Sequence, residues 1–252
     1  MYGWRARIGL MIAHSNTIME PEFNRVLPEG VSVHTSRVRI EKVTVDGLRD
    51  MNRNVEGALE NLCEIDAASF AYACTAASWV GSHEADREMA KKIEDRTGRP
   101  AVTAAGSVLD GLRALGVRRL SVATPYPPEV NVHVKAFIES QGFEVLNIGG
   151  ENFGRIEPLP PLAEGIASHP GLQPPYLSYK IGRKNFARGS DALFISAAGI
   201  RTLDVIESLE CDLGVPVVSS SQAIIWAALR AAGVREAIPG YGKLLRVADP
   251  VS

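Results

Sequence analysis

The sequence predicts an α/β protein with two pseudosymmetric Rossmann-like lobes, each containing a parallel sheet, and an active site in the cleft between the lobes. Three observations support this fold class. Short, continuous apolar runs alternate with segments of helical spacing, which is typical of parallel strands covered by helices. Small polar residues follow several of these runs, where parallel sheets bind ligands. Finally, the two halves of the chain resemble each other.

The first half of the chain alternates between strand and helix patterns. The apolar run at residues 7–13 predicts a central strand, and the alternation at residues 31–38 predicts a peripheral strand. Apolar spacing over residues 44–62 predicts one helix with Thr44 as its N-cap. A buried strand at residues 68–73 then leads directly to Cys74. The same criteria predict a helix at 83–97, a strand at 100–103 and a helix at 107–115.

The second half continues in the same way. Between residues 149 and 175 the chain is rich in proline and glycine, which predicts mostly loop with a short helix near residues 161–168. This loop is either a functional lid or a variable surface connection. Strands are predicted at 119–124, 143–148, 191–196 and 215–219, and helices at 129–140, at 202–213 and from Ser220 or Ser221 to 232.

Two pairs of segments reveal an internal repeat. Residues 97–103 resemble residues 213–219, and each segment precedes a helix. Residues 71–75 match residues 194–198, which places Ala197 opposite Cys74. Such a repeat implies two βα lobes related by a pseudo-twofold axis, with both sets of strand ends facing one cleft. We expect residues 1–115 plus 225–252 to form the N-terminal lobe and residues 116–224 to form the C-terminal lobe.

The composition argues against a nucleic-acid-binding or membrane protein. With 27 Lys+Arg against 29 Asp+Glu among 252 residues, the net charge of −2 gives no general attraction to nucleic acid or to a membrane surface. No run approaches the ~18 apolar residues that a spanning helix needs, and the apolar run near the start is too short for a signal peptide. Three cysteines, an odd number, favour reduced thiols and a cytoplasmic location.

No cofactor or metal is expected from the motifs. The first strand lacks a Gly-rich dinucleotide fingerprint, no P-loop occurs, and no lysine is flanked as in pyridoxal phosphate enzymes. His83, Glu84 and Asp86 lie close in sequence, but their spacing differs from the two-histidine pattern of helical zinc sites.

Cys74 is the strongest candidate for chemistry, because it follows a buried strand and precedes a helix. A lone cysteine is more often a small buried hydrophobe, so the residues around Cys74 must decide between a structural and a catalytic role. A helix N-terminus there can lower the pKa of the thiol. Around it we expect hydroxyls, amides and backbone donors that suit a carboxylate and a developing enolate. The candidates are Ser15, Asn16, Thr75, Tyr126, Asn152 and Ser196, with Tyr126 alternatively a packing residue.

Several motifs resemble the cofactor-independent aspartate/glutamate racemase superfamily. Residues 12–17 with Met19 and Glu20, and residues 72–74, resemble its maleate cis-trans isomerase branch. The second half is more similar to the arylmalonate decarboxylase branch, through residues 124–126 with Val130 and Asn131, residues 199–204 and residues 214–221. The resemblance covers nearly the whole chain and is weakest between residues 149 and 188.

The resemblance implies two pseudosymmetric α/β lobes with one cysteine offered from each side of the cleft. By analogy with the isomerases, Cys74 is the nucleophile, and Asn16 and Tyr126 bind the substrate carboxylates. In the decarboxylases glycine replaces Cys74, while threonine and tyrosine at the positions of Thr75 and Tyr126 stabilise the enediolate and the second cysteine returns the proton. Here the second position is Ala197, so the chain keeps the first thiol, as the isomerases do, and lacks the second.

From this departure we predict an isomerase of a small unsaturated dicarboxylate that uses Cys74 as its single thiolate. Ser15, Thr75, Asn152, Ser196 and the wall at Ala197, Ala198 and Gly199 are expected to bind the substrate. An arylmalonate-type decarboxylase or an α-carbon racemase is the alternative, although a racemase needs groups on both faces of the α-carbon. A carboxylate-binding protein without turnover is the non-enzymatic alternative, and the resemblance also suggests a homo-oligomer.

Overall fold

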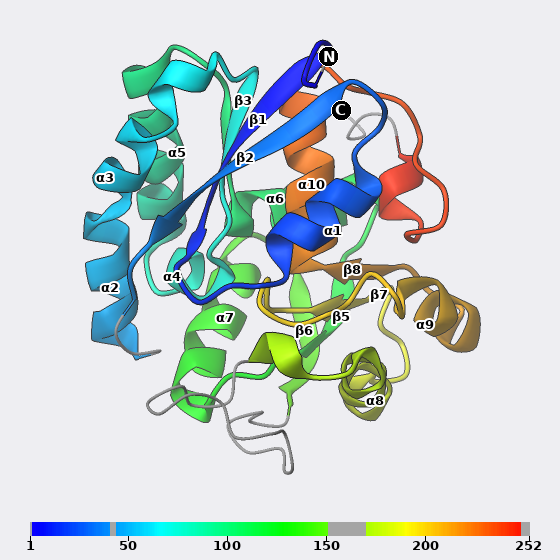
Figure 1. Ribbon diagram of the computed structural model, residues 1–252. Helices are drawn as coiled ribbons and strands as arrows, with labels where there is room; N and C mark the ends of the chain where they lie inside the picture. Colours follow the sequence, from blue (N-terminus) through cyan, green and yellow to red (C-terminus); the bar gives the residue numbers. More distant parts are fainter. Residues whose placement is uncertain (1, 41–43, 151–169, 248–252) are drawn as a thin grey trace.

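The computed structural model describes residues 2–40, 44–150 and 170–247, and it contains two four-stranded parallel sheets. In Figure 1 the first sheet stands above the second, and β1 and β3 run down toward the second sheet. The α/β class with two lobe-like sheets is therefore confirmed. The first sheet contains β1 (Ala6–Ala13), β2 (Val31–Val38), β3 (Ser69–Tyr72) and β4 (Ala101–Thr103). The second contains β5 (Arg119–Ala123), β6 (Glu144–Gly149), β7 (Ala192–Ile195) and β8 (Val217–Ser219).

Both sheets have the same strand order, which confirms the internal repeat. The orders are β2-β1-β3-β4 and β6-β5-β7-β8, so β1 corresponds to β5 and β3 to β7. Asn16 and Tyr126 each follow the first central strand of their sheet at the same spacing. Cys74 and Ala197 likewise follow β3 and β7 at equal spacing. The repeat thus brings these four residues to the carboxyl ends of equivalent strands.

The helices of the first sheet are α1 (Met19–Val26), α2 (Val45–Arg53), α3 (Val55–Glu60), α4 (Thr75–Trp79), α5 (His83–Thr97) and α6 (Ala104–Ala114). Those that follow are α7 (Pro128–Ser140), α8 (Pro175–Asn185), α9 (Ile206–Leu213) and α10 (Ser220–Ala231). Short 3-10 segments occur at Cys63–Ile65, Pro170–Leu172 and Leu244–Arg246. No helix within the described ranges is both long and apolar enough to span a membrane.

The same side-chain contact recurs in both halves at the turn before the last strand. Glu94 accepts a hydrogen bond from the backbone N–H of Ala101 (3.2 Å), and Glu210 accepts one from Val217 (3.0 Å). Gly98 ends α5 and Gly214 ends α9, both with positive φ, a conformation that glycine adopts without steric cost. The repeat therefore extends from the sequence to the local hydrogen bonds.

One helix prediction was wrong, and two helices were not predicted. The predicted helix at 44–62 is two helices, because the backbone leaves the helical region at Asn54 (φ −91°, ψ 5°). Helix α1 was not predicted, because its eight residues include a proline and three charged side chains, although Met19, Phe23 and Val26 have helical spacing. Helix α8 was also missed. It begins at Pro175, which the sequence analysis took as the end of a loop, although proline is well suited to the first turn of a helix.

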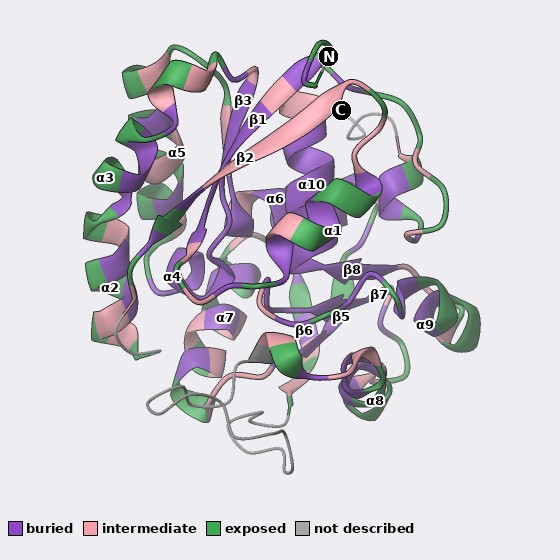
Figure 2. Ribbon diagram, viewed as in Figure 1, coloured by how far each residue is buried: buried purple, intermediate pink, exposed green. Residues whose placement is uncertain are grey.

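Helices α6 and α10 pack against each other between the two sheets. Helix α10 follows the second sheet yet contacts β3 and β4, while α6 follows the first sheet and contacts β8. A continuous apolar core therefore joins both sheets, and a second core lies on the outer face of the first sheet under α2, α3 and α5. Figure 2 shows buried residues along the central strands and α10. The lobe boundaries given above stay a prediction.

A buried carboxyl group links α5 to the start of α6. Asp86 accepts a hydrogen bond from the hydroxyl of Thr103 (2.5 Å), and that hydroxyl in turn accepts one from the backbone N–H of Gly106. Burial raises the pKa of Asp86 to about 6, above the unfolded value of about 4. The neutral form therefore stabilises the folded state fully below pH 4, and this contribution is lost as the pH rises to 6.

We predict that Asp86→Asn removes this pH dependence. The difference in unfolding free energy, variant minus parent, should become more favourable between pH 4 and pH 7 by up to about 3 kcal/mol. Denaturant unfolding at several pH values measures it. Asp95→Asn, an exposed position on the same helix, is the matched control and should give a nearly constant difference. A constant difference for Asp86→Asn as well would contradict the argument.

Candidate active site

Cys74 lies at the junction of β3 and α4, where it is the N-cap residue with an extended backbone (φ −112°, ψ 93°). Its side chain is buried, and the backbone N–H of Ala77 in the first turn of α4 approaches the sulfur. That N–H favours the thiolate, but burial outweighs it and raises the pKa of the Cys74 thiol to about 11. The prediction of a lowered pKa was therefore wrong, and Cys74 is a neutral thiol at neutral pH.

A hydrogen-bonded pair of polar residues supports α4 from the outer side of the sheet. The hydroxyl of Tyr72 donates to the Asn52 side chain (2.7 Å), and the Asn52 amide donates to the Ala77 carbonyl (3.1 Å). Ala77 is the residue whose N–H faces the thiol, so this pair fixes the cysteine's surroundings. Asn52 was not among the predicted site residues, because it lies in a helix rich in polar and charged side chains.

Tyr126 faces Cys74 from the second sheet. The hydroxyl of Thr124 accepts a hydrogen bond from the Tyr126 backbone N–H (3.3 Å) and donates to Asn131 (2.6 Å), which fixes the loop after β5. The ring packs against both apolar cores. Burial, and secondarily the nearby Cys74, raise the pKa of Tyr126 above its usual range, while a hydrogen bond with Ser196 opposes this shift. Tyr126 is thus a neutral phenol held beside the thiol.

Ser196 connects the two sides of the site. Its hydroxyl accepts a hydrogen bond from the Trp79 indole N–H of α4 (3.2 Å) and is fully buried. The next residues, Ala197 and Ala198, are also buried, whereas a methyl group added at Gly199 would meet no atom within 4 Å. The second side of the site therefore carries a hydroxyl and small side chains, with no titratable group from Ser196 to Gly199. The sequence analysis did not identify Trp79.

Asn16 ties the first sheet's loop to the second side of the site. Its carbonyl oxygen accepts hydrogen bonds from Ile18 (2.8 Å) and Met19 (3.0 Å), and its amide donates to the Ala198 carbonyl (2.9 Å). Only one N–H of the Asn16 side chain is left to donate to a substrate, which is fewer hydrogen bonds than the sequence led us to expect. Arg37, which was also not predicted from the sequence, donates to the backbone carbonyl of Asn16 (2.8 Å) and fixes the same loop.

The remaining candidates have different surroundings. Thr75, next to Cys74, is buried with a hydroxyl that has no hydrogen-bond partner, as expected of a group that awaits a ligand. Ser15 is partly exposed in the loop after β1. Asn152 and the predicted helix at 161–168 lie outside the described residues. Tyr126 thus interacts with both the thiol and Ser196, and Asn16 is hydrogen-bonded to Ala198.

The groups gathered here are hydroxyls, amides and a thiol, which bind anions by hydrogen bonding without a full counter-charge. Among the described residues, no three His, Cys, Asp or Glu side chains lie close enough to hold a metal ion. Asp86, considered above for a metal, bonds to Thr103 instead. His83 packs edge-on against Phe137 (ring centroids 6.0 Å apart).

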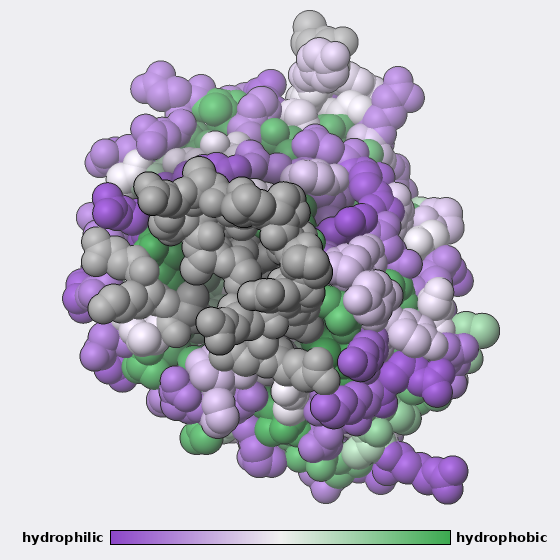
Figure 3. Space-filling view, turned by 60° about the horizontal axis from the view of Figure 1, so that its bottom comes forward, coloured by the Kyte–Doolittle hydropathy of each residue, from purple (hydrophilic) through white to green (hydrophobic). Residues whose placement is uncertain are grey.

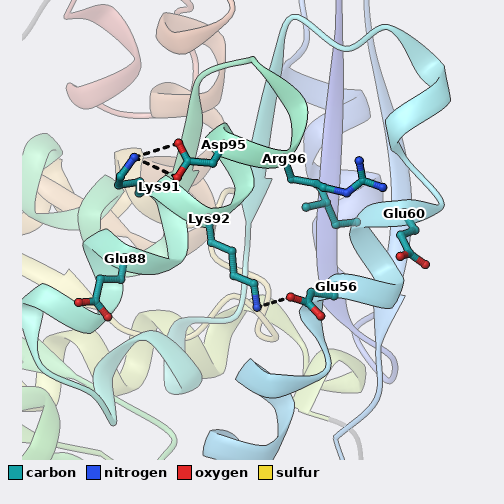
Figure 4. Close-up of a pocket in the computed structure, with 8 residues that line it drawn as sticks. Glu56, Glu60, Glu88, Lys91, Lys92, Asp95 and Arg96 are labelled. Atoms are coloured by element: carbon teal, nitrogen blue, oxygen red, sulfur yellow. Dashed lines mark hydrogen bonds and ion pairs between the residues drawn. The ribbon is translucent and has the colours of Figure 1, made fainter.

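A different hollow, of about 500 Å³, lies on the surface between α3 and α5 (Figure 4). Ion pairs cross or flank it, including Lys92 with Glu56 (2.6 Å) and Lys91 with Asp95 (2.9 Å). Exposed pairs of this kind contribute little to stability, and their opposite charges leave no strong net field. Figure 3 shows separate hydrophobic areas on one face of the molecule. Leu172 and Tyr176 are exposed.

Sequence comparisons identify relatives of the same length. The family described as arylmalonate decarboxylase matches residues 8–245 of this chain. A maleate isomerase of Nocardia farcinica is 28% identical over 250 residues, covering 95% of each chain. An arylmalonate decarboxylase of Bordetella bronchiseptica is 30% identical over 244 residues, covering 94% of this chain and 95% of its own. The predicted resemblance to these two branches is confirmed.

Structure comparisons agree. A maleate isomerase of Pseudomonas putida S16, a cysteine-to-alanine variant solved with maleate, has a TM-score of 0.85 at 26% identity and covers 98% of this chain and 99% of its own. An arylmalonate decarboxylase in which a glycine was changed to cysteine and a cysteine to serine has a TM-score of 0.82 at 28% identity, covering 95% and 98%.

We predict that Cys74 reacts slowly with iodoacetamide at pH 7.5, on the order of 100-fold slower than an ordinary thiol of pKa ~8.5. Its rate should rise about tenfold per pH unit until pH 10, because only the thiolate reacts. Peptide mass spectrometry measures the three cysteines separately, with the exposed Cys211 as internal reference and Cys74→Ser as the control. Equal rates for Cys74 and Cys211 at pH 7.5 would disprove the raised pKa.

Proposed function

Because the chain belongs to the arylmalonate decarboxylase family, we propose that it is a cofactor-independent enzyme that acts beside a substrate carboxylate, specifically an isomerase of a small unsaturated dicarboxylate such as maleate. One observation carries this proposal. Cys74, a buried thiol at the end of β3, lies beside Tyr126 and next to the unpartnered hydroxyl of Thr75. The arrangement provides a nucleophile together with neutral donors for a carboxylate.

The proposed reaction proceeds through one sulfur atom. The thiol gives its proton to a substrate carboxylate as the sulfur bonds to one alkene carbon. Negative charge then develops on the other carbon and spreads into its carboxylate, where Thr75 and Tyr126 donate hydrogen bonds. The former double bond is now single and rotates. The negative charge then re-forms the double bond and expels the sulfur, which takes back the proton from the substrate carboxylate, so that the trans isomer leaves and the thiol is restored. A neutral resting thiol suits this sequence, since the substrate dianion supplies the base.

One relative supports covalent chemistry at a cysteine. The structure of a Nocardia farcinica maleate cis-trans isomerase variant, with one cysteine changed to serine, contains a covalently bound succinylcysteine intermediate (TM-score 0.83, 27% identity). That variant and the Pseudomonas putida S16 variant described above each lack one cysteine, as this chain does at Ala197. We therefore propose that Cys74 corresponds to the cysteine that carries the intermediate, with Asn16, Ser15, Ser196 and Asn152 contributing to substrate binding.

A second candidate function, arylmalonate-type decarboxylation, is favoured by the neutral state of Cys74. A protonated thiol suits return of a proton to an enediolate after carbon dioxide leaves. The decarboxylase variant with one added and one removed cysteine has the same single-thiol arrangement that we propose here. Proton delivery from Cys74 instead of the opposite face would invert the product hand. Racemisation is disfavoured because Ala197 cannot act as a second acid or base.

We propose small carboxylates as the ligands, a homo-oligomeric assembly and a cytoplasmic location. The first rests on the uncharged donors of the site and on the relatives named above. The cytoplasmic location rests on the three cysteines, none of which forms a disulfide in the structure. A carboxylate-binding protein without turnover would show ligand-induced thermal stabilisation that persists in Cys74→Ser, with no substrate consumed by the parent.

Incubation with maleate and, separately, with phenylmalonate in heavy water distinguishes the two reactions. Proton NMR should show fumarate signals from maleate, while phenylmalonate should remain intact. A deuterated monoacid from phenylmalonate, without fumarate from maleate, would refute isomerisation and support decarboxylation. Cys74→Ser should abolish turnover, with a loss of at least about 10³-fold, because the nucleophile is gone.

We predict that Ala197→Cys raises the rate of maleate isomerisation. A thiol opposite Cys74 adds a proton donor for the carbon that becomes negatively charged, and general acid catalysis typically contributes ~10²-fold or more. Steady-state kinetics on maleate measure the gain, and Ala198→Cys, one residue further along the same loop, is the matched control. If Ala197→Cys leaves kcat unchanged, the position does not face the reacting carbon.

A further inference from the structure

A buried carboxyl group connects α1 of the first sheet to the loop on the second side of the site. Glu22 is 4% exposed, and its Oε1 accepts hydrogen bonds from the backbone N–H groups of Thr202 (3.2 Å) and Leu203 (3.4 Å). Those two residues lie shortly after Ala197 and Ala198. We refer to residues 197–203 as the wall loop.

The first sheet therefore holds the wall loop at both ends. Asn16, just before α1, donates to the carbonyl of Ala198 (2.9 Å), and Glu22, within α1, binds Thr202 and Leu203. Both contacts come from the segment that follows β1. A shift of α1 relative to the second sheet would consequently move the wall that faces Cys74. Within the second sheet, Thr202 also donates to the hydroxyl of Ser219 (2.9 Å).

The surroundings of Glu22 suit an uncharged acceptor. Its second oxygen and the Ser221 hydroxyl are both buried without a hydrogen bond of standard geometry, although they lie near each other. Burial raises the pKa of Glu22 to about 7, and Asp204 adds to the rise, while Asp204 itself is paired with Arg25 (2.7 Å) and Arg201 (3.1 Å). A hydrogen bond between the second oxygen and Ser221, which opposes this rise in pKa, would satisfy both atoms whether or not the carboxyl group carries a proton.

We propose that Glu22 is a positioning residue whose accepting oxygen, and not its charge, holds the wall loop at its distance from Cys74. The role in catalysis rests on the function proposed above, whereas the structural contact does not depend on it. The length of the side chain is essential, because the carboxyl group must span the junction from α1 to two neighbouring backbone N–H groups. A group of the same length with an accepting oxygen should therefore replace it.

Three substitutions test separately the length, the charge and the accepting oxygen of the Glu22 side chain. Glu22→Gln keeps the length and the accepting oxygen, Glu22→Asp keeps the charge but is one methylene shorter, and Glu22→Leu keeps the approximate size without an acceptor. Amide hydrogen exchange at Thr202 and Leu203 reports on the contact without requiring turnover. We expect exchange at least ~10-fold faster in Glu22→Leu and Glu22→Asp, and near the parent rate in Glu22→Gln.

On the substrate that the parent converts, kcat should fall by ~10-fold or more in Glu22→Leu and Glu22→Asp, with KM changed much less, and recover in Glu22→Gln. Phe23→Leu, a buried neighbour on α1 that removes no hydrogen bond to the wall loop, controls for lost stability and should keep the parent kcat. If Glu22→Leu does not fold, the comparison of Glu22→Asp with Glu22→Gln carries the test.

Unchanged exchange at Thr202 and Leu203 in Glu22→Asp and Glu22→Leu would overturn the proposal, as would equal losses of kcat in Glu22→Gln and Glu22→Asp. A parent protein that converts neither maleate nor phenylmalonate would refute the proposed function instead. In that case the exchange measurements alone decide whether Glu22 holds the wall loop.

Discussion

The packing of α6 against α10 is the contact on which the arrangement of the two sheets depends. Each of these helices follows the last strand of one sheet and contacts the other, so that one apolar core serves both. Burying that surface fixes the sheets with the carboxyl ends of β1, β3, β5 and β7 near one another. The contacts that build the site, from Trp79 to Ser196 and from Asn16 to Ala198, are possible only because this packing brings the two halves together.

The site combines burial with neutral hydrogen-bonding groups. Burial raises the pKa of the Cys74 thiol and of Tyr126, so both are protonated at neutral pH. A bound dicarboxylate would bring the negative charge with it, and hydroxyl and amide donors would stabilise that charge without a buried cation. A bound substrate would therefore change the charge of the site, and its carboxylate would help to determine whether the thiol is protonated.

Pseudosymmetry in the fold is combined with asymmetry in the chemistry. Equivalent strand ends carry Asn16 and Tyr126, and the other pair carries Cys74 and Ala197. The first pair thus has an amide on one side and a phenol on the other, and the second pair has a thiol on one side only. Because the two sides are separate loops on separate sheets, their relative position is itself a variable that contacts such as those of Glu22 can fix.

The sequence by itself determined the strands, their repeat and the candidates Cys74, Thr75, Tyr126 and Ser196, since apolar runs and turn residues are local signals. It missed α1 and α8, each of which has a proline in its first turn. It also gave the wrong direction for the thiol pKa, because burial depends on chain segments distant in sequence. Only the tertiary structure showed that the Asn16 side chain forms most of its hydrogen bonds within the protein and that Glu22 accepts a hydrogen bond from Thr202. The contacts of Asn16 with Ala198 and of Glu22 with Thr202 join residues about 180 positions apart, and no local pattern encodes such a pairing.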